Sequence, residues 1–491
     1  MRCEILRMEK VTYLEQDNPV LQNFDLCIMQ REIMGLLPIN HFGIATLLKL
    51  LLENDPIYYG YIYFRGKLIN SWKESGAKKR TPQLSLISEE SSLIEGQSVL
   101  SNIFVYQRGF RDWIIRNRVL EKRLGGIFEE LSLEIDPRSS VESLGSFERI
   151  IVEIIRGITA GHSLMIFNEL GAVLSEEELK KLYQIIRYYR ERGISFLLIS
   201  PHYEELKMIC DRTAFLKDGQ IMKIAKDQRE GEEIASAISK NYRKQINFYL
   251  KDRKLWDKMT AFCVRYLGKT ERQGFEFTIR EGECLVLQFL DSADYRDFSD
   301  CLTGEGRKRD ADFLLDGRRI CPGRDRECAV IWEQADKSML FPELSFMENL
   351  CFTMEFALGN PIKRKRMRDR IRREQEELFG KAVVLKAAGE LTKREKYALV
   401  YHRILLQRPK FVFCIQPFKN AGLAQRERIW ELQRMLLQNG IALIIPTISM
   451  ADSLSIADRI IRLHTQGEAE EWKRTSFHLL PDTVPFHDLY S

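Results

Sequence analysis

Side chains that could carry chemistry are scattered along this chain and form no familiar catalytic motif. None of the seven histidines stands at a metal-ligand spacing from another, and none of the ten cysteines forms a C-x-x-C pair. No Ser–His–Asp or Cys–His arrangement can be argued from the order of the residues. The sequence therefore predicts no metal site and gives no support to the common hydrolase and thiol-redox chemistries.

One charged segment stands out from the rest of the chain. The run KRKRMRDRIRR at 363–373 holds eight basic residues in eleven positions, and Glu374, Glu376 and Glu377 follow it. This pattern is typical of a solvated, charged helix. The alternative is an electrostatic dock for a nucleic acid or an anionic membrane surface. Interleaved aromatic residues and a recognised nucleic-acid motif are both absent, which weakens the nucleic-acid alternative.

The overall composition is that of an ordinary globular protein. Of the 491 residues, 45% are apolar and 30% are charged, and the net charge of +5 is a weak bias at this length. No apolar run approaches the roughly 18 residues of a spanning helix, and the opening residues MRCEILRMEK do not suggest a signal peptide. Scattered cysteines within apolar runs fit a reducing compartment. We therefore expect a soluble, cytoplasmic protein that can still dock on a membrane partner.

The chain repeats itself at an offset of about 250 residues, which indicates a tandem duplication. Asn102 and Asn349 stand at equivalent positions in the two copies, and so do Asp211 and Asp458. We expect the first domain over 1–245 and the second over 246–491. The segments that recur are 23–37 with 274–288, 59–69 with 310–320, 98–104 with 345–352, and 210–219 with 457–467.

The elements within each copy follow an α/β pattern. The short apolar runs SLMIFN (163–168) and SFLLIS (195–200) are typical of buried parallel strands. Between them, 175–193 predicts a helix that is capped by Ser175 and ends at Gly193. This is a β-α-β unit. The polar stretch 231–254 predicts a further helix around the domain junction.

These features resemble the ATP-binding subunits of ABC-type monosaccharide importers (ribose, galactose and xylose types), which fuse two ATPase cassettes in one chain. The resemblance covers nearly the whole sequence and is most specific over 166–219. In such proteins this stretch runs from the Walker B strand and D-loop, through a helix and a strand, to the switch histidine and a last hairpin. The resemblance implies two P-loop NTPase cassettes, each with an antiparallel β edge and a helical subdomain. It also implies ATP and Mg²⁺ as cofactors and an integral-membrane sugar permease as partner.

The phosphate loop of the family, G-x-x-x-x-G-K-[ST], aligns with PINHFGIATL at 38–47. Its glycines let backbone N–H groups approach the phosphates, its Lys binds the β- and γ-phosphates, and its hydroxyl binds Mg²⁺. Here Pro38 replaces the first glycine, Ile44 replaces the Lys, and Ala45 replaces the hydroxyl residue. Asn40, Gly43 and Thr46 are the positions left that could still contact a nucleotide. An ordinary strand–loop–helix turn that binds no nucleotide is the simpler interpretation of this loop.

Other motif positions of the first cassette are also altered. The Q-loop position is Glu89, an acid in place of a Gln, and the signature motif is ESLGS at 142–146, which retains Ser143 and Gly145. Tyr13 stands where an aromatic ring stacks on adenine, although an aromatic residue near an N-terminal strand is commonly plain packing.

The two residues that could still catalyse hydrolysis in the first cassette are Glu169 and His202. The Walker B strand ends in Asn168–Glu169, so an amide replaces the Asp that coordinates Mg²⁺, whereas Glu169 still stands at the position of the general base. The switch histidine aligns with Pro201, and a one-residue slip would bring His202 into its place. An exposed loop histidine is the simpler interpretation of His202.

The second cassette departs further from the family. The loop at the phosphate position has no glycine and carries three aspartates, which would repel phosphate. Basic residues replace both glycines of the signature, and the Walker B pair is replaced by an aliphatic residue and an amide. These changes are Asp291, Asp294 and Asp297 in 287–298, Lys393 and Arg394 in 391–395, and Ile415 and Gln416 in 411–417.

In the family, each ATP lies between the phosphate loop of one cassette and the signature loop of the other, so both composite sites are incomplete here. We therefore interpret the chain as a degenerate, ATPase-like subunit that binds a permease or a regulatory partner without hydrolysing ATP. Two alternatives stay open. One is a working ATPase that energises monosaccharide import, and the other is a scaffold or regulator with no permease.

Overall fold

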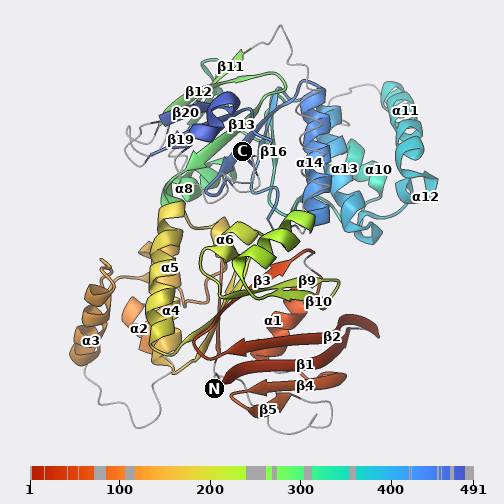
Figure 1. The fold of residues 1–491 in the computed structure, drawn as a ribbon. Helices are drawn as coiled ribbons and strands as arrows, with labels where there is room; N and C mark the ends of the chain where they lie inside the picture. Colours follow the sequence, from red (N-terminus) through yellow and green to blue (C-terminus); the bar gives the residue numbers. More distant parts are fainter. Residues whose placement is uncertain are drawn as a thin grey trace. The chain divides into compact units, whose positions relative to one another are not determined.

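The computed structural model (Figure 1) describes most of the chain. The described residues are 3–15, 17–40, 42–53, 55–70, 84–104, 117–238, 261–267, 274–303, 312–352, 361–419, 421, 423–450, 453–454, 456–464 and 469–480.

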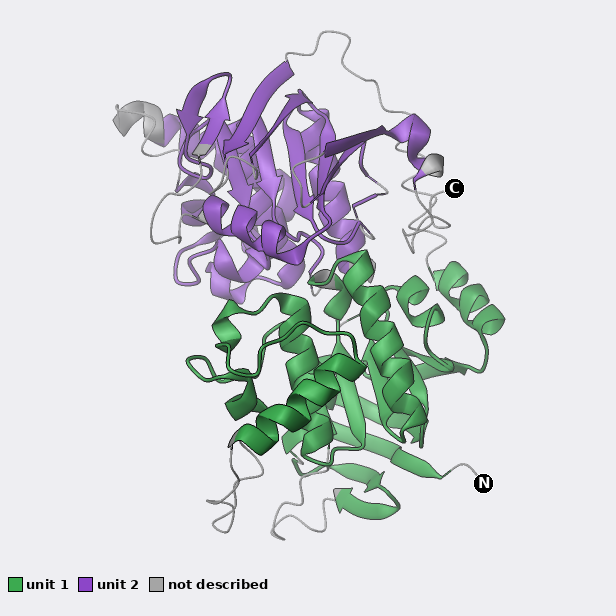
Figure 2. Ribbon diagram, turned by 90° about the vertical axis from the view of Figure 1, so that its left-hand side faces the viewer, with its two compact units in different colours: residues 1–241 green, residues 242–491 purple. Residues whose placement is uncertain are grey.

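The chain separates into two compact units, Met1–Asn241 and Tyr242–Ser491 (Figure 2). The junction that the sequence predicts at residue 245 lies outside the described residues, as does most of the helix predicted over 231–254. Its first part, up to residue 238, is helical. Among the described helices, none combines the length and the apolarity that crossing a bilayer requires.

The first unit is built on a six-stranded sheet in the order β10-β9-β3-β8-β7-β6. Neighbouring strands from β9 to β6 run parallel, and β10 is an antiparallel edge. The central strands are apolar and buried along nearly their whole length, as a parallel sheet covered on both faces requires. The strands are β3 (Ile33–Pro38), β6 (Leu84–Ser88), β7 (Leu164–Asn168), β8 (Ser195–Ile199), β9 (Arg212–Lys217) and β10 (Gln220–Ala225).

A second, antiparallel sheet in the order β2-β1-β4-β5 forms the β edge of this unit. The segment 23–37 connects the two sheets, because β2 ends at Met29 in the antiparallel sheet and β3 begins at Ile33 in the six-stranded sheet. The strands of this sheet are β1 (Glu4–Glu15), β2 (Asn18–Met29), β4 (Tyr59–Phe64) and β5 (Lys67–Asn70).

The helix predicted over 175–193 is α5 (Glu176–Glu191), and it connects two parallel strands as expected. Ser175 forms a capping box with Glu178, and Gly193 adopts a φ of +102° two residues after the helix ends. The other helices of the first unit are α1 (Ile44–Glu53), α2 (Val99–Phe104), α3 (Asn117–Glu130), α4 (Ser146–Thr159) and α6 (Tyr203–Lys207).

The second unit repeats this topology strand for strand. Its six-stranded sheet has the order β16-β17-β18-β13-β19-β20, which is the first order read from the other edge, and its antiparallel sheet is β12-β11-β14-β15. The strands are β11 (Ala261–Leu267), β12 (Phe275–Arg280), β13 (Cys284–Phe289), β14 (Asp312–Leu315), β15 (Arg318–Ile320), β16 (Cys328–Ile331), β17 (Phe411–Cys414), β18 (Ala442–Thr447), β19 (Arg459–Leu463) and β20 (Ala469–Lys473). The helices are α8 (Ser292–Thr303), α9 (Ala335–Ser338), α10 (Phe346–Cys351), α11 (Pro361–Phe379), α12 (Lys381–Val384), α13 (Lys393–Gln407) and α14 (Leu423–Gln438).

A buried asparagine braces the start of the helical layer in each unit. Asn102 accepts a hydrogen bond from the N–H of Ile94 at 2.7 Å and donates to its carbonyl at 3.1 Å. Asn349 makes the same pair of bonds to Phe341, at 2.9 and 3.0 Å. Both side chains are at most 1% exposed, so the amide substitutes for water at backbone groups that could not otherwise be satisfied.

A buried ion pair braces the sheet of each unit in the same duplicated way. Arg212 contacts Glu32 at 2.6 Å and donates to the carbonyl of Cys27, while Arg459 contacts Glu283 at 2.8 Å and donates to the carbonyl of Thr278. In each case the arginine is the first residue of a strand, β9 or β19. Its guanidinium binds a glutamate in the turn that connects the antiparallel sheet to the central strand. The repeat in the sequence is therefore a repeat of contacts as well.

Each six-stranded sheet separates two apolar cores. In β7, Leu164 and Ile166 belong to the core shared with the antiparallel sheet, whereas Met165 and Phe167 belong to the core beneath the helices. This alternation follows from the two-residue period of a strand. The four cores of the chain hold nearly all of its large buried side chains, and four buried cysteines lie among them.

Candidate functional site

The loop after β3 packs closely against β2 and against the turn between β9 and β10 at Gly43. Gly43 has a φ of +88°, and a Cβ built on it would lie 2.9 Å from Leu21 Cδ2 and 3.2 Å from the Cα of Gly219. Glycine is therefore required at this position both by its backbone conformation and by the close approach of β2 and of the β9–β10 turn. His41, which the sequence places in this loop, lies outside the described residues.

Asn40 is held by a reciprocal pair of hydrogen bonds. Its Nδ2 donates to Asp218 Oδ1 at 2.7 Å, and its Oδ1 accepts from the backbone N–H of Asp218 at 3.1 Å. Both hydrogen-bonding groups of the amide are therefore engaged with the turn between β9 and β10. The sequence predicted Asn40 as a contact for a nucleotide, but the structure gives it a partner within the chain.

The side chain at the position of the phosphate-binding Lys points into the core. Ile44 is 5% exposed and packs with Leu47, Leu50 and Leu51 of α1 in the core shared with the antiparallel sheet. Thr46 is half-buried on the same helix. The first turn of α1 therefore presents no cation to the loop.

Glu169 follows β7 in a left-handed conformation, with φ +54° and ψ +40°. Its N–H donates to the carbonyl of Ile199 at the end of β8, at 2.9 Å. The preceding Asn168 has a buried Oδ1 with no hydrogen-bond partner among the described residues. A left-handed backbone at a non-glycine residue is uncommon, and here it turns the chain sharply out of the sheet.

The segment after Glu169 is fixed by a buried carboxylate. Glu205 on α6 accepts a hydrogen bond from Ser200 Oγ at 2.6 Å, and its Oε1 would lie 2.2 Å from a Cβ on Gly171. The short 3₁₀ turn Leu170–Ala172 therefore rests directly on this carboxylate. His202 begins α6 as its N-cap residue, and its N–H donates to Ser200 Oγ at 3.1 Å.

The topology brings one group of predicted residues to the same edge of the sheet. Gly43, Glu169, His202 and Glu89 each follow one of the parallel strands β3, β7, β8 and β6, and the carboxyl ends of parallel strands meet at one edge. Glu89 is exposed there. This edge is where α/β sheets bind their ligands.

The other predicted residues lie elsewhere in the first unit. Ser143 and Gly145 precede α4 in the helical layer. The hydroxyl of Ser143 donates to the carbonyl of Ser140 at 2.7 Å, and the N–H of Gly145 donates to Glu148 at 2.9 Å. Tyr13 lies on β1 and packs against the core between the two sheets. Both arrangements are ordinary helix capping and packing.

In the second unit, a carboxylate occupies the place that a phosphate takes at the start of the loop helix. Asp291 Oδ1 accepts from the N–H groups of Ala293, at 2.7 Å, and Asp294, at 3.3 Å, at the N-terminus of α8. These are the backbone donors that a phosphate would use at a helix N-terminus. The sequence predicted that Asp291 would repel phosphate, but it missed this capping role, which an Asp before a helix signals.

The other motif positions of the second unit also differ in their chemistry from those of the family. Burial, reinforced by the neighbouring Asp291 and Asp297, raises the pKa of Asp294. Gln416, which stands where Glu169 stands in the first unit, keeps the left-handed conformation with φ +39°. The signature position begins α13 with a capping box between Thr392 and Glu395. The backbone of the site persists in this unit although its chemical groups are gone.

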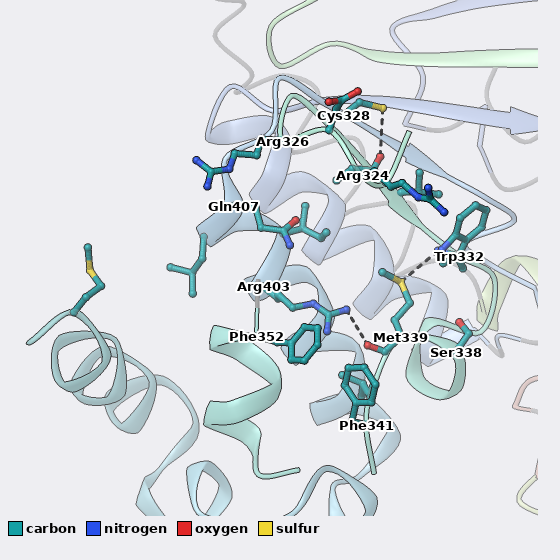
Figure 3. Close-up of a pocket in the computed structure, with 18 residues that line it drawn as sticks. Arg324, Arg326, Cys328, Trp332, Ser338, Met339, Phe341, Phe352, Arg403 and Gln407 are labelled. Carbon is teal, nitrogen blue, oxygen red and sulfur yellow. Dashed lines mark hydrogen bonds between the residues drawn. The ribbon is translucent and has the colours of Figure 1, made fainter. Parts of the chain in front are cut away.

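A pocket of about 820 Å³ lies in the second unit beside β16, α10 and α13 (Figure 3). Phe341 and Phe352 line it with rings whose centroids are 4.9 Å apart, and both are more than 40% exposed. Arg403 is nearly buried and donates to the carbonyl of Met339 at 2.8 Å, while burial lowers its pKa. Sequence reasoning missed this pocket, because its lining comes from segments more than 70 residues apart.

The fold and the site edge together define a class of protein. Two successive units with one topology, each with a parallel sheet, an antiparallel β edge and a helical layer, make this chain a tandem pair of ABC-type, P-loop NTPase-like cassettes. The fold predicted from the sequence is thereby confirmed.

The relatives of the chain are sugar-import proteins over almost its full length. It is 23% identical to a xylose import ATP-binding protein of Histophilus somni, across 95% of this chain and 96% of the relative. It is 24% identical to a ribose import ATP-binding protein of Rubrobacter xylanophilus, across 93% of each. It is also 24% identical to a galactose/methyl galactoside import ATP-binding protein of Salmonella typhimurium, across 90% and 89%. The resemblance to tandem ATP-binding subunits of monosaccharide importers is confirmed.

No family model matches the chain. Among solved structures, CbiO1 of Clostridium perfringens, part of an ABC transporter complex, aligns with a TM-score of 0.41 at 17% identity, over 51% of this chain and 96% of that one. An ATP-binding cassette of an ABC transporter in its ADP conformation aligns with a TM-score of 0.42 at 19% identity, over 49% and 98%.

Proposed function

We propose that this chain is a pseudo-ATPase subunit of an ABC importer of the sugar type, which binds a membrane-embedded permease without using ATP. The observation that carries the proposal is that side chains of the chain itself occupy the positions at which the family binds phosphate. Ile44 is buried in the core of the first unit, and the Asp291 carboxylate accepts the N–H groups at the start of α8 in the second. Both loops therefore hold their shape without an anion from outside.

The residues present do not fit a bound Mg²⁺–ATP. In the first unit the positions of the Lys and of the metal-binding hydroxyl are Ile44 and Ala45, which provide neither a cation nor an oxygen ligand. In the second unit a phosphate would have to displace Asp291 and approach Asp294 and Asp297, against electrostatic repulsion. Removing such groups costs several kcal/mol of transition-state stabilisation for each, on the order of a hundredfold or more in rate.

The pocket of the second unit is the surface that we assign to the partner. It combines two exposed phenylalanines, whose rings contact each other at a tilt, with the guanidinium of Arg403, so it fits a partner segment that presents an apolar side chain beside a carboxylate or a carbonyl. Trp332 lines the pocket, and Glu333 follows it. These two residues come directly after β16, at the place where Ser88 and Glu89 lie at the end of β6 in the first unit. In this proposal the chain is peripheral at the inner, cytoplasmic face of the cell membrane and is held there by the permease.

Affinity purification from detergent-solubilised membranes of the native host tests the proposal. We expect a multi-span permease to be recovered equally with and without Mg²⁺–ATP, and to be lost from the double variant Phe341→Ala/Phe352→Ala. Phe42→Ala is the matched control, because Phe42 is an equally exposed phenylalanine in the first unit. Recovery only with ATP would refute nucleotide independence, and recovery of no permease would favour a scaffold or regulator.

A working ATPase is the second candidate, and one observation favours it. Asn168 Oδ1 is buried without a partner among the described residues, and Glu169 follows it at the carboxyl edge of the sheet. An amide oxygen can ligate Mg²⁺, and Glu169 and His202 would then serve as base and switch residue. Phosphate release by the purified protein, compared with Glu169→Gln, separates the two candidates. We expect no difference, and a clear loss in the variant would place the ATPase ahead.

A further inference from the structure

Helix α11 carries its charges in an order that does not stabilise a helix. Its described side chains begin with six cations and one carboxylate, Asp369, between 365 and 373, and continue with three carboxylates between 374 and 377. A helix favours carboxylates near its N-terminus and cations near its C-terminus, because of the partial charges at its ends. There is no acidic residue in the first turn and no basic residue in the last. The cations are therefore not explained by the stability of the helix itself.

The packing of α11 leaves five of these six cations in solvent. Ile371 and Gln375, one turn apart, are the buried residues that attach the helix to the second unit. Lys365, Arg366, Arg370, Arg372 and Arg373 are exposed, and α11 lies on the far side of α10 and α13 from the sheet (Figure 1). Arg370 pairs with Glu374 at 3.0 Å, which in solvent contributes little.

The corresponding helix of the first unit shows that the fold does not require this charge. The buried residues in the described part of α3 are Leu124 and Phe128. They correspond to Ile371 and Gln375 of α11, because the same number of residues separates each pair as separates Asn102 from Asn349. By the same correspondence, the positions of three exposed arginines in α11 are uncharged in α3. These pairs are Val119 with Arg366, Gly125 with Arg372, and Gly126 with Arg373.

The positive charge extends beyond the helix to the rim of the pocket. Arg324 and Arg326 are exposed and line the pocket on the side of β16 (Figure 3). Met367 of α11 lines the pocket as well. Met367 is 39% exposed between Arg366 and Arg368. A cationic surface with an apolar side chain among its charges suits the interface of an anionic bilayer.

We propose that the basic surface formed by α11 together with Arg324 and Arg326 docks on anionic lipid headgroups of the membrane. The choice of lipid over other polyanions rests on the proposed function, since a permease bound in the adjoining pocket brings this surface to the bilayer. Docking on lipid is a second attachment, and it requires neither nucleotide nor permease. Each cation close to an anionic surface contributes about a fivefold gain in affinity, so this surface gives reversible binding that weakens with salt.

Vesicle co-sedimentation of the full-length protein, without permease, tests this inference. We expect binding to vesicles of equal parts phosphatidylcholine and phosphatidylglycerol, weak binding to phosphatidylcholine alone, and a decrease with added salt. The variant Arg366→Gln/Arg372→Gln/Arg373→Gln should lower the partition coefficient by roughly tenfold to a hundredfold. The matched control is Arg118→Gln/Lys122→Gln/Arg123→Gln, which removes three exposed cations from the same end of α3.

The outcomes distinguish docking through α11 from binding that depends only on the total positive charge, and from loss of binding because the variant is unfolded. The α11 variant should melt close to the wild-type temperature, because the three arginines removed are exposed and lie outside the first and last turns of the helix. Equal loss of binding in the α3 control, equal binding to both kinds of vesicle, or tighter binding to a single-stranded RNA than to the anionic vesicles would each overturn the inference. Because the vesicles hold no permease, failure here is distinguishable from failure of the purification experiment.

Discussion

In the first unit, the loop after β3 is closed by a side-chain pair, Asn40 with Asp218, that joins it to the turn between β9 and β10. In the second unit, the equivalent loop is closed by Asp291, which caps the helix that follows it. One closure links residues far apart in the chain, and the other is local. The two loops therefore hold equivalent positions by unrelated contacts.

The braces of the two units show the opposite behaviour. Asn102 and Asn349 make matching hydrogen bonds, and the pairs of Arg212 and Arg459 with their glutamates match as well. These contacts serve the fold, and they stayed the same while the phosphate positions diverged. The comparison teaches that a cassette can lose its chemical groups independently of the contacts that hold it together.

The largest effect should come from breaking a brace. Arg459→Ala leaves Glu283 buried without its partner and should lower the free energy of unfolding by about 3–5 kcal/mol. Arg212→Ala should cost less, because the Arg212 side chain is 27% exposed against 11% for Arg459, so water can replace it more readily. Hydrogen exchange resolved by unit, under increasing urea, measures both. Equal costs would show that the two braces are not distinguished by burial.

Restoring the lost cation should damage the first unit without recovering its chemistry. Ile44→Lys places an ammonium where the side chain is 5% exposed and should cost about 2–4 kcal/mol in unfolding free energy. Ile44→Met keeps the volume and should cost less than about 1.5 kcal/mol. Isothermal calorimetry should find the affinity of both variants for Mg²⁺–ATP weaker than millimolar, as for the wild type. A micromolar dissociation constant for Ile44→Lys would mean that the loop is still built for phosphate.

The cap of the second loop should contribute a smaller amount. Asp291→Ala removes the acceptor for the N–H groups of Ala293 and Asp294 and should cost about 1 kcal/mol, whereas Asp291→Asn should keep most of this stability. Urea unfolding followed by circular dichroism measures both variants. If alanine and asparagine behaved alike, capping would not be the role of Asp291.

The smallest effect is a dependence on pH at Asp294. Burial and two neighbouring carboxylates raise its pKa above the ordinary value of 3.8, so the folded protein takes up this proton at a higher pH than the unfolded chain does. The contribution of Asp294 to stability therefore increases as the pH falls from its raised pKa towards 3.8. Wild type should gain stability over Asp294→Asn in that window, as judged by melting temperature. A constant difference across the window would contradict the shift.

Most of the fold could be predicted from the sequence because its signals are local or repeated. The apolar runs of β7 and β8, the capping signal of Ser175 and the constant offset between the copies each depend on neighbouring residues or on self-comparison. The site could be predicted only as a set of motif positions. The partner of Asn40 lies 178 residues away, and no local pattern indicates it. Asp291 carries a local capping signal, because an Asp directly before a helix commonly accepts the first N–H groups of that helix.

The strand order of each sheet also governs how the chain emerges during synthesis. The central strand β3 pairs with β8 and β9, so Ile33 cannot pair until Phe196 has been synthesised. In the second unit, Cys284 cannot pair until Leu443 has been synthesised. At about 5–20 residues per second, each apolar central strand stays unpaired on the order of ten seconds or more after it leaves the ribosome. The first unit can complete its sheet once residue 225, the end of β10, has emerged, while the second is still being made. We therefore expect β3, and later β13, to be the segments of the nascent chain that are most prone to aggregate, each until its own sheet forms.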